Sequence, residues 1–349
     1  MEPVICLKLV CMIISDRFTA GLLSAFVVAA AATMWLHPPR MATAAPRAVL
    51  ADVRTHSKVL AVARAVETDG TSANKLLVIA SVVDSDSASA GTVSDAFASI
   101  GYDLNSIRAG DELVPRLFLT SLPRDIGDVR EPAIRKSIFL KTVLPLVLQV
   151  NEEILAQRGR LWQLRFKLRM GQLLREADRL WLMVMAERYK TQSNDIDTLI
   201  RRVDVIPPSL ALAQAAEESG WGTSRFVREG NALFGQWVFS DKKHLKPEQR
   251  DGDKRHQVMA FESLTSATMA YMKNLNTHPA YASLRQERWN MRRVGVAVDG
   301  YQLAGTLQHY SERGDKYIKS LRIIILANGL EALDQARLHE DDSENKPSI

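Results

Sequence analysis

Cysteine is nearly absent from this sequence: its 349 residues include only Cys6 and Cys11, and both precede a long apolar segment. The rest of the chain therefore has no disulfide, no thiol nucleophile and no cysteine metal site. Its histidines lack metal-ligand spacing, and neither a Gly-x-Ser-x-Gly turn nor a phosphate-binding glycine loop is present. We expect no metal and no cofactor, which leaves carboxyl side chains as the candidates for chemistry.

Strong charge of one sign is also lacking, since the formal net charge is only +5. A mildly basic chain favours an anionic partner such as a cell wall, phospholipid head groups or nucleic acid. No basic stretch is interleaved with aromatic residues in the manner of a nucleic-acid platform. We therefore expect no nucleic acid partner and prefer the wall.

Residues 18–36 carry no charge, follow Arg17 and are about as long as the ~20 residues that a membrane-spanning helix needs. A cleaved signal peptide would explain the cationic flank and the small residues of Ala42-Thr43-Ala44, whereas an uncleaved anchor fits the length better. Both alternatives imply export. We expect residues 1–46 to be a signal peptide or membrane anchor, and the protein to be periplasmic or anchored in the inner membrane.

The remaining chain divides by composition. Residues 47–100 are rich in Pro, Ala, Ser, Thr and Asp and are expected to form a linker. A folded domain is expected over residues 101–335, with its core in 195–330, and the acidic tail 336–349 is expected to be disordered. Helical periodicity predicts one helix from residue 132 to 159, with a kink at Pro145, and a second, basic helix from 160 to 190.

Residues 236–261 lose the helical period. Trp237-Val238-Phe239 and Gln257-Val258-Met259-Ala260-Phe261 flank a polar, turn-rich segment. This pattern predicts two short strands of a β-hairpin.

One further helix is short and apolar, and it ends in two carboxylates. Pro207-Pro208 suits its entry and Gly220 its stop, with mostly Ala and Leu between them. Glu217 and Glu218 would then lie at its C-terminal end, where the helix dipole and burial both raise a carboxyl pKa. A carboxyl that keeps its proton is what a general acid needs to protonate a leaving-group oxygen.

The pair runs directly into Ser219-Gly220-Trp221-Gly222, and Asn231-Ala232-Leu233-Phe234-Gly235 follows. Here the chain resembles the bacterial glucosaminidase-domain family, peptidoglycan hydrolases of the lysozyme superfamily. Residues 228–237 and 271–281 resemble its Bax-type branch of cell-envelope proteins. The resemblance covers about residues 101–330 and implies a mainly α, lysozyme-like helical domain with a small β-hairpin lobe.

By this resemblance Glu218 is the catalytic acid, and Glu217 is the weaker candidate. The family places a second carboxylate on the hairpin, here Glu248, Asp251 or Asp253, and we choose Glu248 because it follows a proline. The acetamido group of the substrate could instead act as the nucleophile, leaving the carboxylate to orient it. The sequence does not decide between these alternatives.

The family also places a late tyrosine in the cleft. We assign Tyr310 to the reacting sugar and Tyr317 to packing, although the Asp-Pro of the family motif is missing between them. The expected substrate-binding residues are three aromatic platforms and one asparagine: Trp221, Phe234, Trp237 and Asn231. Ala232 replaces the second asparagine of the family, so one polar contact is missing.

The expected function is hydrolysis of the β-1,4 bond after N-acetylglucosamine in peptidoglycan glycan strands. One rival is a lytic transglycosylase, which gives an anhydro-muramic product. The other is a noncatalytic wall-binding or scaffolding protein. The sequence leaves the oligomeric state open.

Overall fold

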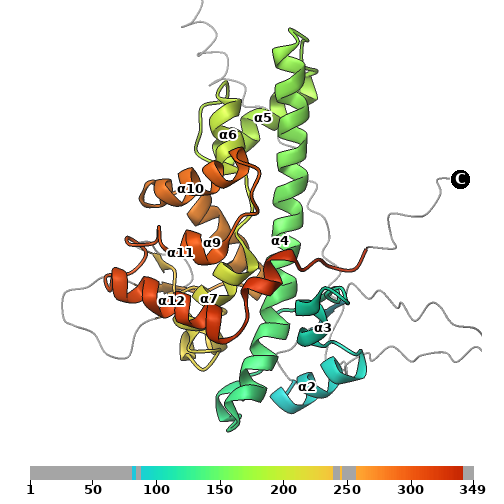
Figure 1. Ribbon diagram of the computed structural model, residues 1–349, viewed down its shortest axis with the longest axis vertical. Helices are drawn as coiled ribbons and strands as arrows, with labels where there is room; N and C mark the ends of the chain where they lie inside the picture. Colours follow the sequence, from blue (N-terminus) through green and yellow to red (C-terminus); the bar gives the residue numbers. More distant parts are fainter. Residues whose placement is uncertain (1–80, 84–87, 239–243, 246–256, 341–349) are drawn as a thin grey trace, which may run out of the picture. The chain divides into compact units, whose positions relative to one another are not determined.

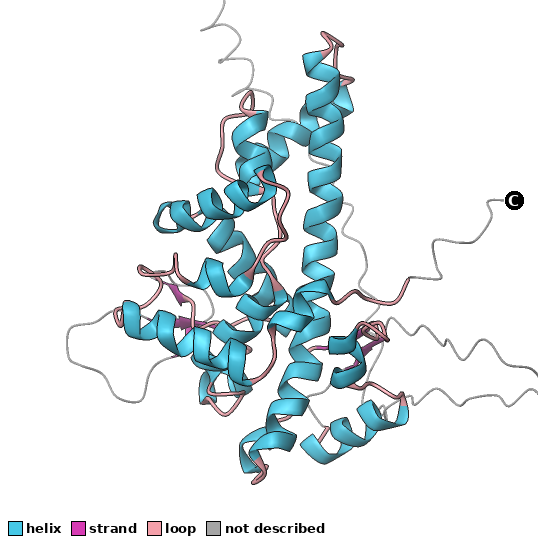
Figure 2. Cartoon of the chain, viewed as in Figure 1, coloured by secondary structure: helices cyan, strands magenta, loops and turns pink. Residues whose placement is uncertain are grey.

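The computed structural model describes residues 81–83, 88–238, 244–245 and 257–340. The described part is mainly helical (Figure 2). Its α-helices are α2 (Ala90–Ser99), α3 (Leu104–Ala109), α4 (Pro132–Arg169), α5 (Glu176–Arg188), α6 (Ile196–Arg202), α7 (Pro208–Ser219), α8 (Arg225–Gly230), α9 (Leu264–Thr277), α10 (Ala282–Arg293), α11 (Gly300–Ala304) and α12 (Asp315–Ala327). Three 3₁₀ turns are η1 (Ile126–Asp128), η2 (Pro279–Tyr281) and η3 (Glu331–Gln335).

The strands are short: β1 (Ser81–Val83), β2 (Leu117–Leu119), β3 (Trp237–Val238), β4 (His244–Leu245) and β5 (Gln257–Met259). β1 pairs with β2 in parallel. β5 lies between β3 and β4 and pairs antiparallel with both. Its Val258 is opposite Trp237 of β3 and also opposite Leu245 of β4. The two strands expected around residues 237 and 257 therefore do pair. The candidate carboxylates Glu248, Asp251 and Asp253 lie outside the described residues.

Helix α4 is 38 residues long and is the green helix of Figure 1. The predicted break at residue 159 is wrong, because α4 continues through both Pro145 and Gly159 to Arg169. A glycine inside a helix costs only about 1 kcal/mol relative to alanine. Buried Arg158 and Leu161 hold the helix on either side of it. The chain turns instead at Gly171, whose φ is +69°.

The boundaries of the folded part differ from those expected. Residues 90–99, assigned to the linker, form α2, whose Val93 and Phe97 are buried at helical spacing in the core. At the other end, Leu338 is buried and bridges to Val114, so the ordered chain extends into the expected tail. The sequence of α2 contains only two large apolar side chains, Val93 and Phe97, so its helical period spans a single pair and does not stand out. No helix within the described residues is long and apolar enough to cross a membrane, and residues 1–46 lie outside them.

Helix α7 contacts α4, α11, α12 and η3. Every residue from Pro208 to Ala216 is buried, because alanine and leucine let neighbouring helices approach on all sides. The closest approach is at Gly300 of α11, where an added Cβ would lie 2.0 Å from the Ser209 Oγ. The helix that ends in the two glutamates is therefore enclosed by the core along its length.

The chain leading into α7 is fixed by a buried charged cluster around Asp204. The carboxylate of Asp204 binds Arg292 through Nη2, at 2.9 Å, and lies 3.5 Å from Arg158 Nη2 and 3.8 Å from Arg288 Nε. Arg288 is buried and also donates to the carbonyl oxygens of Asp204 and Val205. Burial alone would raise the pKa of Asp204, but the attraction of the three guanidinium groups outweighs it and the pKa lies below its usual value. Asp204 is thus a buried carboxylate that neutralises several arginines.

The N-terminus of α7 is capped by Asp334 from η3. Its carboxylate accepts hydrogen bonds from the Ser209 N–H, at 2.7 Å, and from the Ser209 hydroxyl, at 2.8 Å. Burial raises the pKa of Asp334 from 3.8 to about 6, although the bonds from Ser209 oppose this. The cap is therefore a carboxylate that retains its proton more readily in the folded chain than in the unfolded one.

Asp334→Asn is expected to change how stability depends on pH. Because the pKa is raised on folding, this group makes the folded chain more stable below its unfolded pKa, and that contribution is lost as pH rises through about 6. The difference between a pKa of 3.8 in the unfolded chain and about 6 in the folded chain corresponds to about 3 kcal/mol. Urea unfolding at pH 4 and pH 7 should therefore show the advantage of the wild type over the variant shrinking by about that amount. Parallel pH curves would contradict the assignment, and Glu331→Gln, an exposed carboxylate of η3, controls for the lost charge.

Candidate active site

The end of α7 is shaped by the Ser-Gly-Trp-Gly motif. Gly220, Trp221 and Gly222 all have left-handed backbone conformations, with φ of +58°, +58° and +84°. The Ser219 hydroxyl donates to the Ala215 carbonyl at 2.6 Å and accepts from the Gly222 N–H at 3.0 Å. A Cβ at Gly222 would lie 2.9 Å from Leu122 Cδ1. The motif therefore ends the helix directly after the two glutamates and seats the turn against the core.

Glu218 is partly buried in the last turn of α7. Burial raises its pKa, and the negative charge of Glu217 raises it further. A hydrogen bond from Tyr317 and the positive charge of Arg313 act in the opposite direction without cancelling the rise. The side chain thus keeps its proton to a higher pH than an exposed glutamate does, as the sequence predicts for this position.

The neighbouring Glu217 has a different environment. Its carboxylate forms an ion pair with Arg313, and the same guanidinium donates to the Ser320 hydroxyl at 3.0 Å. Arg313 lies in the turn before α12, and its ion pair is with Glu217, although its charge also lowers the pKa of Glu218. The structure therefore separates a paired carboxylate, Glu217, from a carboxyl group with a raised pKa, Glu218.

A row of hydrogen bonds leads to Glu218 from inside the core. The Tyr271 hydroxyl donates to Gln214 Oε1 at 2.7 Å, and Gln214 Nε2 donates to the Tyr317 hydroxyl at 3.1 Å. Tyr317 in turn is hydrogen-bonded to the Glu218 carboxylate. Gln214 lies one turn before Glu218 on α7, and all three row residues are buried. We call Tyr271, Gln214 and Tyr317 the tyrosine–glutamine row. Through Tyr317, this row positions the carboxyl group of Glu218.

Tyrosine rings surround this row. Tyr310 stacks on Tyr317 with ring centroids 5.5 Å apart, and Tyr281 lies 5.7 Å from Tyr310. Burial, together with the negative charge of Glu218, raises the pKa of all four tyrosines. These phenols therefore remain neutral and act as hydrogen-bonding groups rather than as bases.

The two late tyrosines have roles different from those expected. Tyr317, assigned to packing, is the one bonded to Glu218, while the Tyr310 hydroxyl donates to the Phe234 carbonyl oxygen at 3.2 Å. The sequence spacing of seven residues does not reveal these different roles, because Tyr317 lies within α12 whereas Tyr310 lies before it. Tyr310 is half-buried close to the acid, so its contact with a sugar remains a prediction.

Gly235 lies directly against the side chain of Glu218. A Cβ at this position would lie 3.0 Å from Glu218 Oε2 and 3.7 Å from Glu218 Cβ. Its φ of +57° also favours glycine. The last glycine of Asn231–Gly235 is thus required where the loop meets the carboxyl group.

The expected sugar-binding side chains are not all available. Phe234 is only 2% exposed and stacks on Tyr271 at 3.8 Å, so it is a core residue and not a platform. Trp221 is half-buried against Phe139, with Lys136 Nζ 4.7 Å from its ring centroid. Close packing of the motif on α4 and α9 explains both positions.

The other two candidates are less defined. Asn231 ends α8 with a φ of +52° and donates from Nδ2 to the Phe261 carbonyl at 3.3 Å. Its side chain therefore joins two loops. Trp237 lies on β3, and its side chain is outside the described part of the structure.

Sequence reasoning missed Gln214 and Tyr271. The available signal was that Gln214 is the one amide in the Ala/Leu segment of α7, where an unpaired buried amide would be costly. Its partners come from α9 and α12, which are distant in sequence. Periodicity within one helix does not reveal such pairings.

Comparisons with known proteins show the family of the chain. Residues 193–328, which include α7 and every residue of the row, match the family described as Glucosaminidase, mannosyl-glycoprotein endo-beta-N-acetylglucosaminidase. The chain is 35% identical over 204 residues to Protein bax of Escherichia coli (strain K12), an alignment that covers 57% of this chain and 71% of that protein. No solved structure matches. The chain therefore belongs to the glucosaminidase family, in the branch that includes Protein bax.

Proposed function

We propose that this protein is a glycoside hydrolase that cleaves the β-1,4 bond after N-acetylglucosamine in peptidoglycan, on a lysozyme-like helical fold. The observation that carries the proposal is Glu218: a carboxyl group with a raised pKa, held between the tyrosine–glutamine row and Gly235. Family membership supports action on a glycan. The choice of bond and of peptidoglycan rests on the sequence motifs.

In this mechanism Glu218 protonates the glycosidic oxygen as the bond to the sugar carbon breaks. Positive charge then develops on the sugar ring. The hydrogen bond from Tyr317 favours the carboxylate form of Glu218, so it stabilises the state that exists after the proton has left. Burial favours the protonated form of Glu218 before the reaction, and the hydrogen bond from Tyr317 favours the release of the proton.

The group opposite Glu218 is proposed to be Glu248, with Asp251 and Asp253 as alternatives. The acetamido oxygen of the substrate is the other candidate, with the carboxylate orienting it. Glu217 is a poor choice because Arg313 already pairs with it and because it is the immediate neighbour of Glu218 on α7. Water would then complete the hydrolysis, and Glu218 would recover a proton.

The partner and location follow from the same proposal. Peptidoglycan strands are the substrate, and the protein works in the cell envelope, either periplasmic or held to the inner membrane through residues 1–46. A noncatalytic wall-binding protein would not need a half-buried glutamic acid beside a second carboxylate. That observation favours the enzyme over the scaffold.

Mass spectrometry of fragments released from purified peptidoglycan tests the function. The expected fragments end in reducing N-acetylglucosamine and are absent when the Glu218→Gln variant is used. Anhydro-muramic ends would instead identify a lytic transglycosylase. Wall binding without any release of fragments would support the scaffold.

Tyr317→Phe is expected to move the basic limb of the kcat–pH profile to higher pH. The hydroxyl of Tyr317 lowers the pKa of Glu218, so its removal raises that pKa and the acid keeps its proton longer as pH increases. Initial rates measured across pH with soluble glycan fragments would show the shift. Tyr310→Phe is the matched control, because the Tyr310 hydroxyl donates to Phe234 and not to Glu218. An unmoved or acid-shifted limb in Tyr317→Phe would contradict this role.

A further inference from the structure

Helix α4 exposes one of its faces at its C-terminal end. We call residues 155–175, which include this end and the turn toward α5, the α4 tip. The segment contains six arginine and lysine residues and no aspartate or glutamate. Only one of these cations, Arg158, is buried. Four of the six pair with aspartates outside the segment: Arg158 with Asp204, Arg160 and Arg175 with Asp178, and Arg165 with Asp197. Lys167 and Arg169 are the positive charges that remain without an acidic partner among the described residues.

Large apolar side chains lie exposed on the same segment. Leu155, Trp162, Phe166 and Met170 follow one another at intervals of seven, four and four residues, which places them on one face of the helix. Between 39% and 64% of each side chain is exposed, and Leu173 in the following turn is 94% exposed. Leu161 and Leu164 on the opposite face are buried and provide the packing that the helix needs. The exposed stripe is thus additional to the core contacts.

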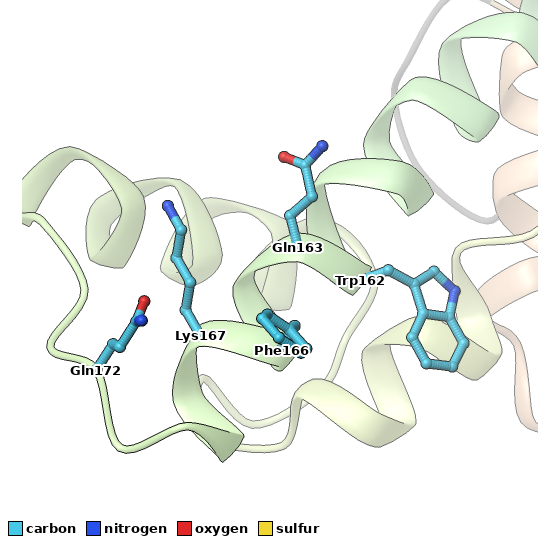
Figure 3. A pocket seen from close by; sticks show the side chains of 5 residues that line it. All are labelled: Trp162, Gln163, Phe166, Lys167 and Gln172. Carbon is cyan, nitrogen blue, oxygen red and sulfur yellow. The ribbon is translucent and has the colours of Figure 1, made fainter.

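The cations lie directly beside this stripe. The guanidinium of Arg165 is 4.9 Å from the Trp162 ring centroid. Figure 3 shows Trp162, Phe166 and Lys167 around a shallow depression whose remaining lining residues are Gln163 and Gln172. Among the residues that the structure describes, no acidic side chain pairs with Lys167 or Arg169. These two charges are available to an external anion.

A stripe of tryptophan, phenylalanine and aliphatic side chains flanked by unpaired cations has the composition of a surface that lies in a membrane interface. Apolar side chains enter the boundary of the acyl chains, while lysine and arginine side chains are attracted to an anionic leaflet. Aliphatic side chains outnumber aromatic ones on the tip, which suits acyl chains better than nucleic-acid bases. The charge selects anionic lipid over neutral lipid.

We propose that the α4 tip docks on the surface of a bilayer that contains anionic phospholipid. Trp162, Phe166 and Leu173 enter the interface, and Lys167 and Arg169 contact lipid phosphates. This contact is separate from the predicted N-terminal segment and does not depend on the glycosidase proposal. It would fix the orientation of the folded domain relative to the bilayer.

A spin label tests this contact locally, in the full chain with Cys6→Ser and Cys11→Ser. The label is placed at Leu173→Cys or, as a matched control, at Ile323→Cys, which is exposed by 65% on α12. With phosphatidylcholine–phosphatidylglycerol vesicles, the label at 173 should gain contact with oxygen and lose contact with a water-soluble nickel chelate. The label at 323 should change little, even if another segment holds the protein to the vesicle. Equal behaviour of the two labels would overturn the proposal.

Charge reversal provides the second measurement. Lys167→Glu with Arg169→Glu should abolish the response of the label at 173, whereas Arg293→Glu with Arg337→Glu, two exposed arginines elsewhere, should leave it intact. Vesicles of phosphatidylcholine alone should give a much weaker response. An undiminished response after reversal at 167 and 169 would contradict the charge contact. Protection of the label before vesicles are added would also overturn the proposal, because another protein surface would then cover the tip.

Discussion

Glu218→Gln is expected to reduce kcat on peptidoglycan by about 10²-fold to 10⁴-fold, the range for losing a general acid. Glutamine keeps the shape of the side chain and accepts the bond from Tyr317, but it has no proton to give. Removing an ionisable group from a partly buried site also avoids a desolvation cost, so the variant should fold normally. Turnover of soluble glycan fragments, measured beside a thermal unfolding curve, tests both statements.

Glu217→Gln is the matched control, because the same substitution is made one residue earlier. It leaves Arg313 without its carboxylate partner and removes a charge that raises the pKa of Glu218. The basic limb of the pH profile should therefore move to lower pH while the maximal rate is largely kept. A loss of turnover in Glu217→Gln with full activity in Glu218→Gln would reverse the assignment.

Asp204→Asn should be the most destabilising of the substitutions considered, by about 3–5 kcal/mol in the free energy of unfolding. The substitution keeps the volume of the side chain but leaves Arg158 and Arg288 buried without a compensating charge. Urea unfolding at neutral pH provides the measurement. The pKa of Asp204 is depressed, so its contribution is present above its usual pKa and is lost as pH falls through the folded value.

Asp197→Asn is the comparison for this loss. Asp197 also pairs with an arginine, Arg165, but its carboxylate is exposed, and surface pairs contribute about 0–1 kcal/mol. A small effect at both positions would mean that the arginines around Asp204 find water or other acceptors. In that case the cluster would not be what fixes the entry to α7.

Local signals in the sequence predict α7 well. The proline pair and Gly220 mark its two ends, and the Ala/Leu content indicates that it is buried. The same kind of reasoning failed at Gly159, because tertiary packing around Leu161 outweighs the small cost of a glycine in α4. The linker prediction failed over α2, because Val93 and Phe97 are its only large buried side chains.

The site was predictable to the extent that it is local. Glu218 and the motif after it are adjacent in sequence, so their proximity follows from one helix end and one turn. Tyr317 was visible in the sequence, but its bond to Glu218 depends on how α12 packs against α7. Phe234 illustrates the opposite error, because the aromatic residue of a motif packs on Tyr271 instead of facing the solvent.

The orientation of the Gln214 amide sets the direction of the hydrogen bonds in the tyrosine–glutamine row, which leads to Glu218. An amide has one accepting end and one donating end, and here the accepting end receives the Tyr271 proton while the donating end points to Tyr317. With the donating end directed at its oxygen, the Tyr317 hydroxyl has its own hydrogen left for Glu218. If the amide were reversed, the Tyr317 hydrogen would point back to Gln214 and away from the acid. The orientation of a single buried amide thus decides whether Glu218 receives a hydrogen bond from the core.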